Sequence, residues 1–212
     1  MKNLLEKDFI EYHNLAGNPV VDIVSTNDEN FDLKDDDTLV YPFGNGIAKY
    51  KNPNRKTIYV INYEKFFKSL PQRFQQNRHN CDLIVYTSDD SHFLLNELTN
   101  TKPEYINDFT QKKDGIPRCG KINVARSQFR QTLEVISDSP TIRSFFNKYA
   151  TKQCCFFNKQ IHAPIGDIIA TKAFNRLSTL NDSSGHKMSD PNIESYGFEL
   201  WEFSGNQVYL FS

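Results

Sequence analysis

Cys81-Asp82-Leu83-Ile84-Val85-Tyr86 and Phe93-Leu94-Leu95-Asn96-Glu97-Leu98-Thr99 are the segments that decide the fold. Both read as apolar strands, and Ser88-Asp89-Asp90-Ser91 between them has the chemistry of a turn, so they predict an antiparallel hairpin. Apolar strands normally exclude acidic residues, because a buried carboxylate needs a compensating cation or donor. Asp82 and Glu97 lie inside these runs, and a divalent metal ion is the simplest partner for them.

Helical patterns flank this hairpin. Upstream, Phe66, Phe67, Leu70 and Phe74 recur at helical spacing, and Pro71 breaks or restarts that helix. Downstream, residues 121–136 predict a long helix with Gln128 at the edge of its apolar stripe. The stripe consists of Ile122, Ala125, Phe129, Leu133 and Ile136.

The remaining pattern alternates strands and helices, which predicts a mixed α+β fold. Ser139-Pro140 is a helix start, and residues 100–120 read as a long loop. The acidic segment 28–37 reads as a solvated loop, because it lacks the spacing and central glycine of a calcium loop. Further expected elements are a hairpin of 47–50 with 57–62, a helix over 140–149, a strand at 153–157, a helix over 167–180 and a C-terminal hairpin of 198–203 with 207–211.

Composition indicates one globular domain over residues 1–212. The chain is 38% hydrophobic and 24% charged, and its formal net charge of -1 gives no overall basic field for nucleic acid. Membrane spanning is not expected, because no window approaches the roughly 18 apolar residues that a span needs. Early charges in residues 1–8 argue against a signal peptide, so a cytoplasmic protein is expected.

The four cysteines lack CxxC spacing and predict reduced, packed thiols, with Cys154 and Cys155 on opposite faces of a strand.

Pairing of the two strands would let Asp82 and Glu97 meet at one site. Mg²⁺ suits such a site, since it binds through one or two carboxylates and keeps positions for water and phosphate oxygens. A metal-bound water beside a polarised phosphate can hydrolyse a phosphodiester.

Residues 57–158 resemble the PD-(D/E)xK, restriction-endonuclease-like phosphodiesterase superfamily. The likeness rests on Cys81-Asp82-Leu83-Ile84, on Asn96-Glu97-Leu98-Thr99 and on Ala125-Arg126-Ser127-Gln128-Phe129. It implies a mixed central sheet flanked by helices, and a nuclease that acts on DNA or RNA with Mg²⁺ or Mn²⁺.

The resemblance also implies site residues. Asp82 and Glu97 would be metal ligands, Gln128 would contribute from the following helix, and Glu64 would supply the acidic residue that many members carry on the preceding helix. Arg126 is placed among the substrate-binding residues, within a basic region of Lys112, Lys113, Arg118, Lys121, Arg126 and Arg130.

One position departs from the superfamily pattern. Its water-activating lysine falls on Thr99, whose neutral hydroxyl cannot supply a positive charge. Lys121 is the first candidate for a substitute cation, and Lys102 is the second. If neither side chain reaches the site, catalysis is weak or absent.

Structural interpretations compete with these functional ones. Asp82 is also a suitable turn or cap residue, and Glu97 can form an ion pair with Lys102 or Arg126. Gln128 and Glu64 are also typical of solvated helix faces. The competing function is a catalytically inactive nuclease-fold protein that serves as a nucleic-acid-binding or protein-interaction module.

Overall fold

The computed structural model describes residues 1–111, 115–159 and 184–212. In these ranges the chain forms a seven-stranded, a four-stranded and a two-stranded sheet together with helices, which confirms the predicted α+β class. No helix in the described ranges has both the length and the apolar character needed to cross a bilayer. The helix expected over 167–180 lies outside the described residues.

The seven-stranded sheet has both acid-bearing strands near its centre, in the order β1-β5-β6-β7-β10-β12-β11. From β1 to β7 the neighbours are antiparallel, whereas β10 is parallel to both β7 and β12, and β11 is antiparallel to β12. The strands are β1 Ile23–Thr26, β5 Ile58–Asn62, β6 Leu83–Thr87, β7 His92–Thr99, β10 Thr151–Asn158, β11 His186–Met188 and β12 Glu199–Ser204.

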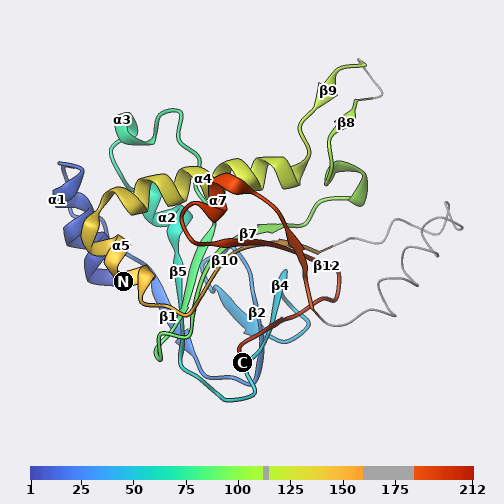
Figure 1. The fold of residues 1–212 in the computed structure, drawn as a ribbon, viewed down its shortest axis with the longest axis horizontal. Coiled ribbons are helices and arrows are strands. Elements are labelled where there is room, and N and C mark those ends of the chain that lie inside the picture. The colour runs from blue at the N-terminus through green and yellow to red at the C-terminus, as the bar shows by residue number, and fades with distance from the viewer. Residues whose placement is uncertain (112–114, 160–183) are drawn as a thin grey trace, which may run out of the picture.

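The helix α4 (Lys121–Asp138) lies across one face of this sheet (Figure 1). Parallel neighbours require a crossover connection, and the chain makes it from β7 to β10 through α4 and α5 (Pro140–Asn147). The expected apolar stripe of α4 is buried, which confirms that helix. The shorter helices are η1 Leu4–Phe9, α1 Ile10–Tyr12, α2 Tyr63–Lys68, α3 Gln72–Gln75, η2 Pro103–Tyr105 and α7 Pro191–Glu194.

The large sheet separates two apolar cores. Cys154 belongs to the core that includes Phe129 of α4, whereas Cys155 belongs to the core that includes Tyr50 of the four-stranded sheet. The two adjacent thiols therefore face opposite sides, as predicted. The four-stranded sheet has the order β13-β4-β2-β3, from β13 Tyr209–Leu210, β4 Ala48–Lys51, β2 Asn30–Leu33 and β3 Val40–Pro42.

Two expected hairpins are wrong. β4 and β5 lie in different sheets, although the turn around Asn52 and Pro53 joins them. β12 pairs with β10 and β11, whereas β13 crosses to the other sheet and runs parallel to β4. In both cases the turn residues correctly mark a change of direction, but a turn does not specify that the flanking strands pair with each other.

The acidic segment 28–37 is only partly a solvated loop. It contains β2, in which Asp32 is fully buried. The Asp32 carboxylate accepts hydrogen bonds from the backbone N–H groups of Gly44, at 2.9 Å, and Gly46, at 2.7 Å. A side chain at Gly46 would place its Cβ 2.3 Å from the Asp32 Cβ, so glycine is required there.

Residues 100–120 also contain more structure than a loop. Besides η2, the strands β8 (Phe109–Thr110) and β9 (Pro117–Arg118) pair into a small arm that projects from the body (Figure 1).

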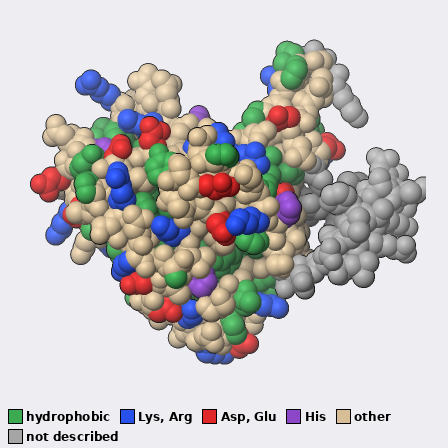
Figure 2. Space-filling model, viewed as in Figure 1, with side chains coloured by type: hydrophobic (Ala, Val, Ile, Leu, Met, Phe, Trp, Pro, Cys, Tyr) green, Lys and Arg blue, Asp and Glu red, His purple; other side chains and the backbone are tan. Residues whose placement is uncertain are grey.

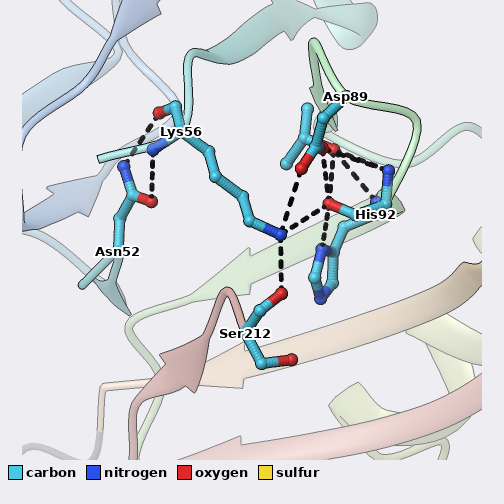
Figure 3. A network of polar contacts seen from close by, with 7 residues as sticks. Asn52, Lys56, Asp89, His92 and Ser212 are labelled. Carbon is cyan, nitrogen blue, oxygen red and sulfur yellow. Dashed lines mark hydrogen bonds and ion pairs between the residues drawn. The ribbon is translucent and has the colours of Figure 1, made fainter. Parts of the chain in front are cut away.

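A polar network fixes the turn between β6 and β7 (Figure 3). Lys56 Nζ donates to Ser91 Oγ at 3.0 Å and to the Ser212 carbonyl at 2.6 Å, and it forms an ion pair with Asp89 at 3.2 Å. The Ser91 hydroxyl lies 2.8 Å from His92 Nδ1 and 2.6 Å from an Asp89 carboxylate oxygen. The turn holds the register of the hairpin whose open end carries Asp82 and Glu97.

Candidate metal centre

Asp82 lies immediately before β6, and Glu97 lies on β7 next to the end of the β6–β7 ladder. Leu83 pairs with Asn96, and the Asp82 N–H continues the ladder by donating to the Asn96 carbonyl at 3.0 Å. The Asp82 carboxylate accepts a 2.7 Å hydrogen bond from the Leu98 N–H. Glu97 shares a face with Leu95, which packs in the core beneath α4, and the charge of Asp82 raises the pKa of Glu97. The two predicted site residues therefore lie close together at the open end of the hairpin.

Glu64 reaches this end of the sheet because α2 begins on Asp82. The N–H groups of Tyr63 and Glu64 donate to the Asp82 carbonyl at 2.9 and 3.0 Å. Asn62 caps the helix by accepting from the Lys65 N–H at 2.8 Å. The first turn of α2 is thus attached to the residue that immediately precedes β6.

Three carboxylates converge at this point: Asp35, Glu64 and Asp82, which we call the acidic cluster. One oxygen from each lies within 4.8 Å of the others. Asp82 is buried, Glu64 is half-buried and Asp35 is exposed. The sequence did not indicate Asp35, because it lies far along the chain from Glu64 and Asp82. It is also followed by two more aspartates, and nothing in the sequence distinguishes it from them.

Lys68 is the cation of the acidic cluster. Its Nζ lies 2.5 Å from Glu64 Oε1, one helical turn away, and the charges of Glu64, Asp35 and Asp82 raise the pKa of Lys68. Sequence reasoning missed Lys68, although the spacing of Glu64 and Lys68 by four residues is a detectable signal on a helix.

Burial and mutual repulsion disfavour the charged form of these carboxyl groups. Burial is the largest cause for Asp82, whose pKa rises to about 7, while the Leu98 hydrogen bond opposes the rise. Burial followed by the charge of Asp82 raises the pKa of Glu97 to about 9. Although Asp35 as a residue is exposed, loss of hydration around its carboxyl group, together with the neighbouring charge of Glu64, raises its pKa to about 6. A divalent cation would reverse this balance, because it favours the ionised forms.

Gln128 lies beside Glu97 at the edge of the α4 stripe. Its amide Nε2 donates to the Asn80 carbonyl at 2.9 Å, and the same side chain counteracts the raised pKa of Glu97. Glu97 Oε2 and Gln128 Oε1 are buried without a hydrogen-bond partner. Buried polar atoms are rarely left unpaired, so both are open to a ligand.

The candidate replacements for the motif lysine lie at the surface. Lys121, the first residue of α4, and Lys102 are both exposed. Thr99 ends β7 and is half-buried. Over the described ranges, no ion pair joins Glu97 to Lys102 or to Arg126. The role of Lys121 as an activating cation therefore stays a prediction.

The expected basic region is partly engaged elsewhere. Arg130 makes two hydrogen bonds, of 3.1 and 2.7 Å, to the fully buried Asp190, so it has a structural partner. Lys112 and Lys113 lie outside the described residues. On the face drawn in Figure 2, positive and negative side chains are interspersed.

The acidic cluster fits a hard divalent cation. Oxygens on one ion are at most two metal–oxygen distances apart, which is ~4.2 Å for Mg²⁺ and ~5 Å for Ca²⁺. The cluster oxygens lie within 4.8 Å of one another, so the three carboxylates could hold a metal ion. The all-oxygen donor set also matches Mg²⁺, Mn²⁺ or Ca²⁺ and not a soft metal.

Comparison of the chain with protein-family models, curated proteins and solved structures finds no match.

Proposed function

We propose that this protein is a metal-dependent phosphodiesterase that cleaves nucleic acid. The observation that carries the proposal is the convergence of Asp35, Glu64 and Asp82 to within 4.8 Å, with Glu97 near enough for the charge of Asp82 to raise its pKa. These clustered carboxylates lie at one end of a sheet and are costly to ionise. Both properties are expected of a site that binds a divalent cation.

The arrangement of elements supports this class of reaction. Asp82 immediately precedes one strand, Glu97 lies on the next, and Gln128 returns from the following helix, an order close to the one that the restriction-endonuclease-like resemblance implies. Glu64 lies on α2 beside Asp82, which matches the additional acidic position of that resemblance.

Each side chain has a defined part in the proposed reaction. Asp35, Glu64 and Asp82 hold the cation, and Glu97 supplies a further carboxylate next to it. A cation held there would supply Lewis-acid chemistry toward a phosphodiester and its attacking water. Gln128 orients Glu97 from above the sheet. Lys68 provides the positive charge that Thr99 lacks, because it is already held at Glu64.

A cleavage assay tests the proposal. Supercoiled plasmid, single-stranded DNA and RNA are incubated with Mg²⁺ or Mn²⁺, using wild type, Asp82→Ala and Glu97→Ala. Glu29→Ala is a matched control, since Glu29 is an acid whose ion pair with Arg55 is exposed and outside the cluster. The proposal is supported if cleavage depends on the metal, is lost in Asp82→Ala and in Glu97→Ala, and is retained in Glu29→Ala. A folded wild type that neither cleaves nor binds Mn²⁺ refutes it.

A second candidate is an inactive interaction module on the same fold. Two observations favour it: Thr99 stands at the lysine position, and Lys68 already neutralises part of the cluster through Glu64. Such a module would bind its partner without divalent cations, and Asp82→Ala would leave that binding unchanged.

A further inference from the structure

Asn158, at the end of β10, is a buried side chain with no partner. It is 1% exposed, and neither its Nδ2 nor its Oδ1 has a hydrogen-bond partner. Its backbone is satisfied, since its carbonyl accepts from the Gly205 N–H at 2.9 Å. An amide with a free donor and a free acceptor is costly to bury unless something pairs with it.

The position of Asn158 places this amide on the strand next to the one that carries Glu97. In the parallel register Asn158 is opposite Thr99, and Phe156 is opposite Glu97. Asn158 shares a face with Cys154 and Phe156, which pack in the core beneath α4, and therefore with Glu97 and Thr99. On its other side Asn158 is opposite Ser204 of β12. We call Glu97, Thr99, Asn158 and Ser204 the polar row.

Two side chains of α4 complete the surroundings of the polar row. Arg126 and Gln128 flank the buried stripe on its two sides, and each has a buried polar atom without a partner, Nε of Arg126 and Oε1 of Gln128. Arg126 extends toward β11 and β12, where its Nη2 lies 3.8 Å from Met188 Sδ and its charge acts on Glu202. Unpaired donors thus lie under the first half of α4, over the part of the sheet from β10 to β12.

We infer that Asn158 and Arg126 bind a phosphate of the nucleic-acid substrate on the α4 face of the sheet, one strand away from Glu97. The inference rests on the proposed function and adds to it the group that receives the phosphate. Asn158 Nδ2 and Arg126 Nε are N–H donors, and phosphate oxygens are the acceptors for which Arg is best suited. The acidic cluster alone would repel a phosphodiester, so donors outside it are needed to hold the substrate.

The main experiment measures binding instead of turnover. A fluorescently labelled single-stranded oligodeoxynucleotide is titrated with the full chain in Ca²⁺, and Mn²⁺ binding is measured separately by calorimetry. The variants are Asn158→Leu, Asn158→Asp and, as a control, Gln153→Ala, which removes an amide from the opposite face of the same strand. Thermal midpoints are recorded for all four proteins.

Asn158→Leu should weaken oligonucleotide binding by ~10-fold or more, the effect of one lost hydrogen bond to a charged group. Its Mn²⁺ affinity should not change, and its thermal midpoint should be equal or higher, because two unpaired polar atoms are removed. Asn158→Asp should weaken oligonucleotide binding further through repulsion. Gln153→Ala should bind like wild type.

Several results would overturn the inference. If either Asn158→Leu or Asn158→Asp binds the oligonucleotide like wild type, Asn158 does not contact a phosphate. If the variant also has a lower thermal midpoint, the role of Asn158 is to stabilise the fold. Tighter Mn²⁺ binding by Asn158→Asp without weaker oligonucleotide binding makes it a metal neighbour. A wild type that binds Mn²⁺ but no oligonucleotide refutes the inference and leaves the metal centre, whereas binding of neither refutes the proposed function itself.

Discussion

The Asp82 carboxylate accepts a 2.7 Å hydrogen bond from the backbone N–H of Leu98, on the strand that carries Glu97. This bond keeps Asp82 directed toward the neighbouring strand, while α2 begins on the carbonyl of the same residue. Asp82 is therefore both a junction between α2 and the hairpin and the buried member of the acidic cluster.

Asp82→Asn separates these two roles. The amide oxygen can still accept from Leu98, so the hairpin should be preserved, and loss of a buried like charge should raise the thermal midpoint of the metal-free protein. Stabilisation by Mn²⁺, which follows from selective binding to the folded state, should disappear. Differential scanning fluorimetry with and without Mn²⁺ measures both effects. A variant that retains the full Mn²⁺ shift would show that Asp82 is not a ligand.

Glu97→Gln should remove part of the pH dependence of stability. Burial and Asp82 raise the folded pKa of Glu97 to about 9, above its ordinary value of 4.5. The folded state therefore holds more protons than the unfolded state between these values, and the free energy of unfolding falls as pH rises through this window. Glu97→Gln should be more stable than metal-free wild type at pH 8 by at least ~1.4 kcal/mol, the equivalent of one pKa unit. Urea unfolding at pH 5 and pH 8 checks this, and an equal difference at both pH values would contradict it.

The hairpin and its acids were predictable because all the necessary information is local. The apolar runs of β6 and β7, the Ser88–Ser91 turn and the stripe of α4 each lie within a short window. Asp35 was not predictable, because its contact with Glu64 and Asp82 depends on how the loop after β2 folds over a sheet to which β2 does not belong.

The role of Asn158 could not be predicted from the sequence either. This residue follows Cys154-Cys155-Phe156-Phe157, and from the sequence it reads as the polar end of an apolar strand. Only the parallel pairing with β7 and β12 places it beside Thr99 and under α4. Strand order, which turn residues do not encode, decides which side chains share a site.

Lys68→Met tests the assignment of the missing positive charge. Its Nζ lies 2.5 Å from Glu64, so removal of the charge should lower metal-free stability slightly and should strengthen Mn²⁺ binding several-fold. If Lys68 supports the reaction, cleavage should nevertheless be lost. Lys65→Met is the matched control on the same helix, since Lys65 pairs with Asp22 and Asp37 outside the cluster. If Lys68→Met cleaves like wild type, Lys68 is not the activating cation, and Lys121 is again the first candidate.

His92 should limit stability in acid, with a sign opposite to that of Glu97. Burial, aided by the charge of Lys56, lowers the folded pKa of His92 from 6.5 to about 4. The unfolded chain therefore binds the proton first, and the free energy of unfolding falls as pH falls through this window, by up to ~3 kcal/mol. His92→Asn should flatten this acid limb in urea titrations between pH 4 and pH 7. The exposed His79→Asn should leave the limb unchanged, and an unaltered limb in His92→Asn would exclude the assignment.

Arg130→Met should damage the fold and not the binding of nucleic acid. The two hydrogen bonds of Arg130 hold Asp190, which is fully buried and caps α7 by accepting from the Ile193 N–H at 3.3 Å. Removal of one partner leaves a buried carboxylate uncompensated, which typically costs ~3–5 kcal/mol. The double variant Arg130→Met with Asp190→Asn should recover part of this loss, because the unpaired charge is gone. If Arg130→Met instead unfolds like wild type but binds an oligonucleotide more weakly, Arg130 belongs to a nucleic-acid surface, as the basic run in the sequence predicted.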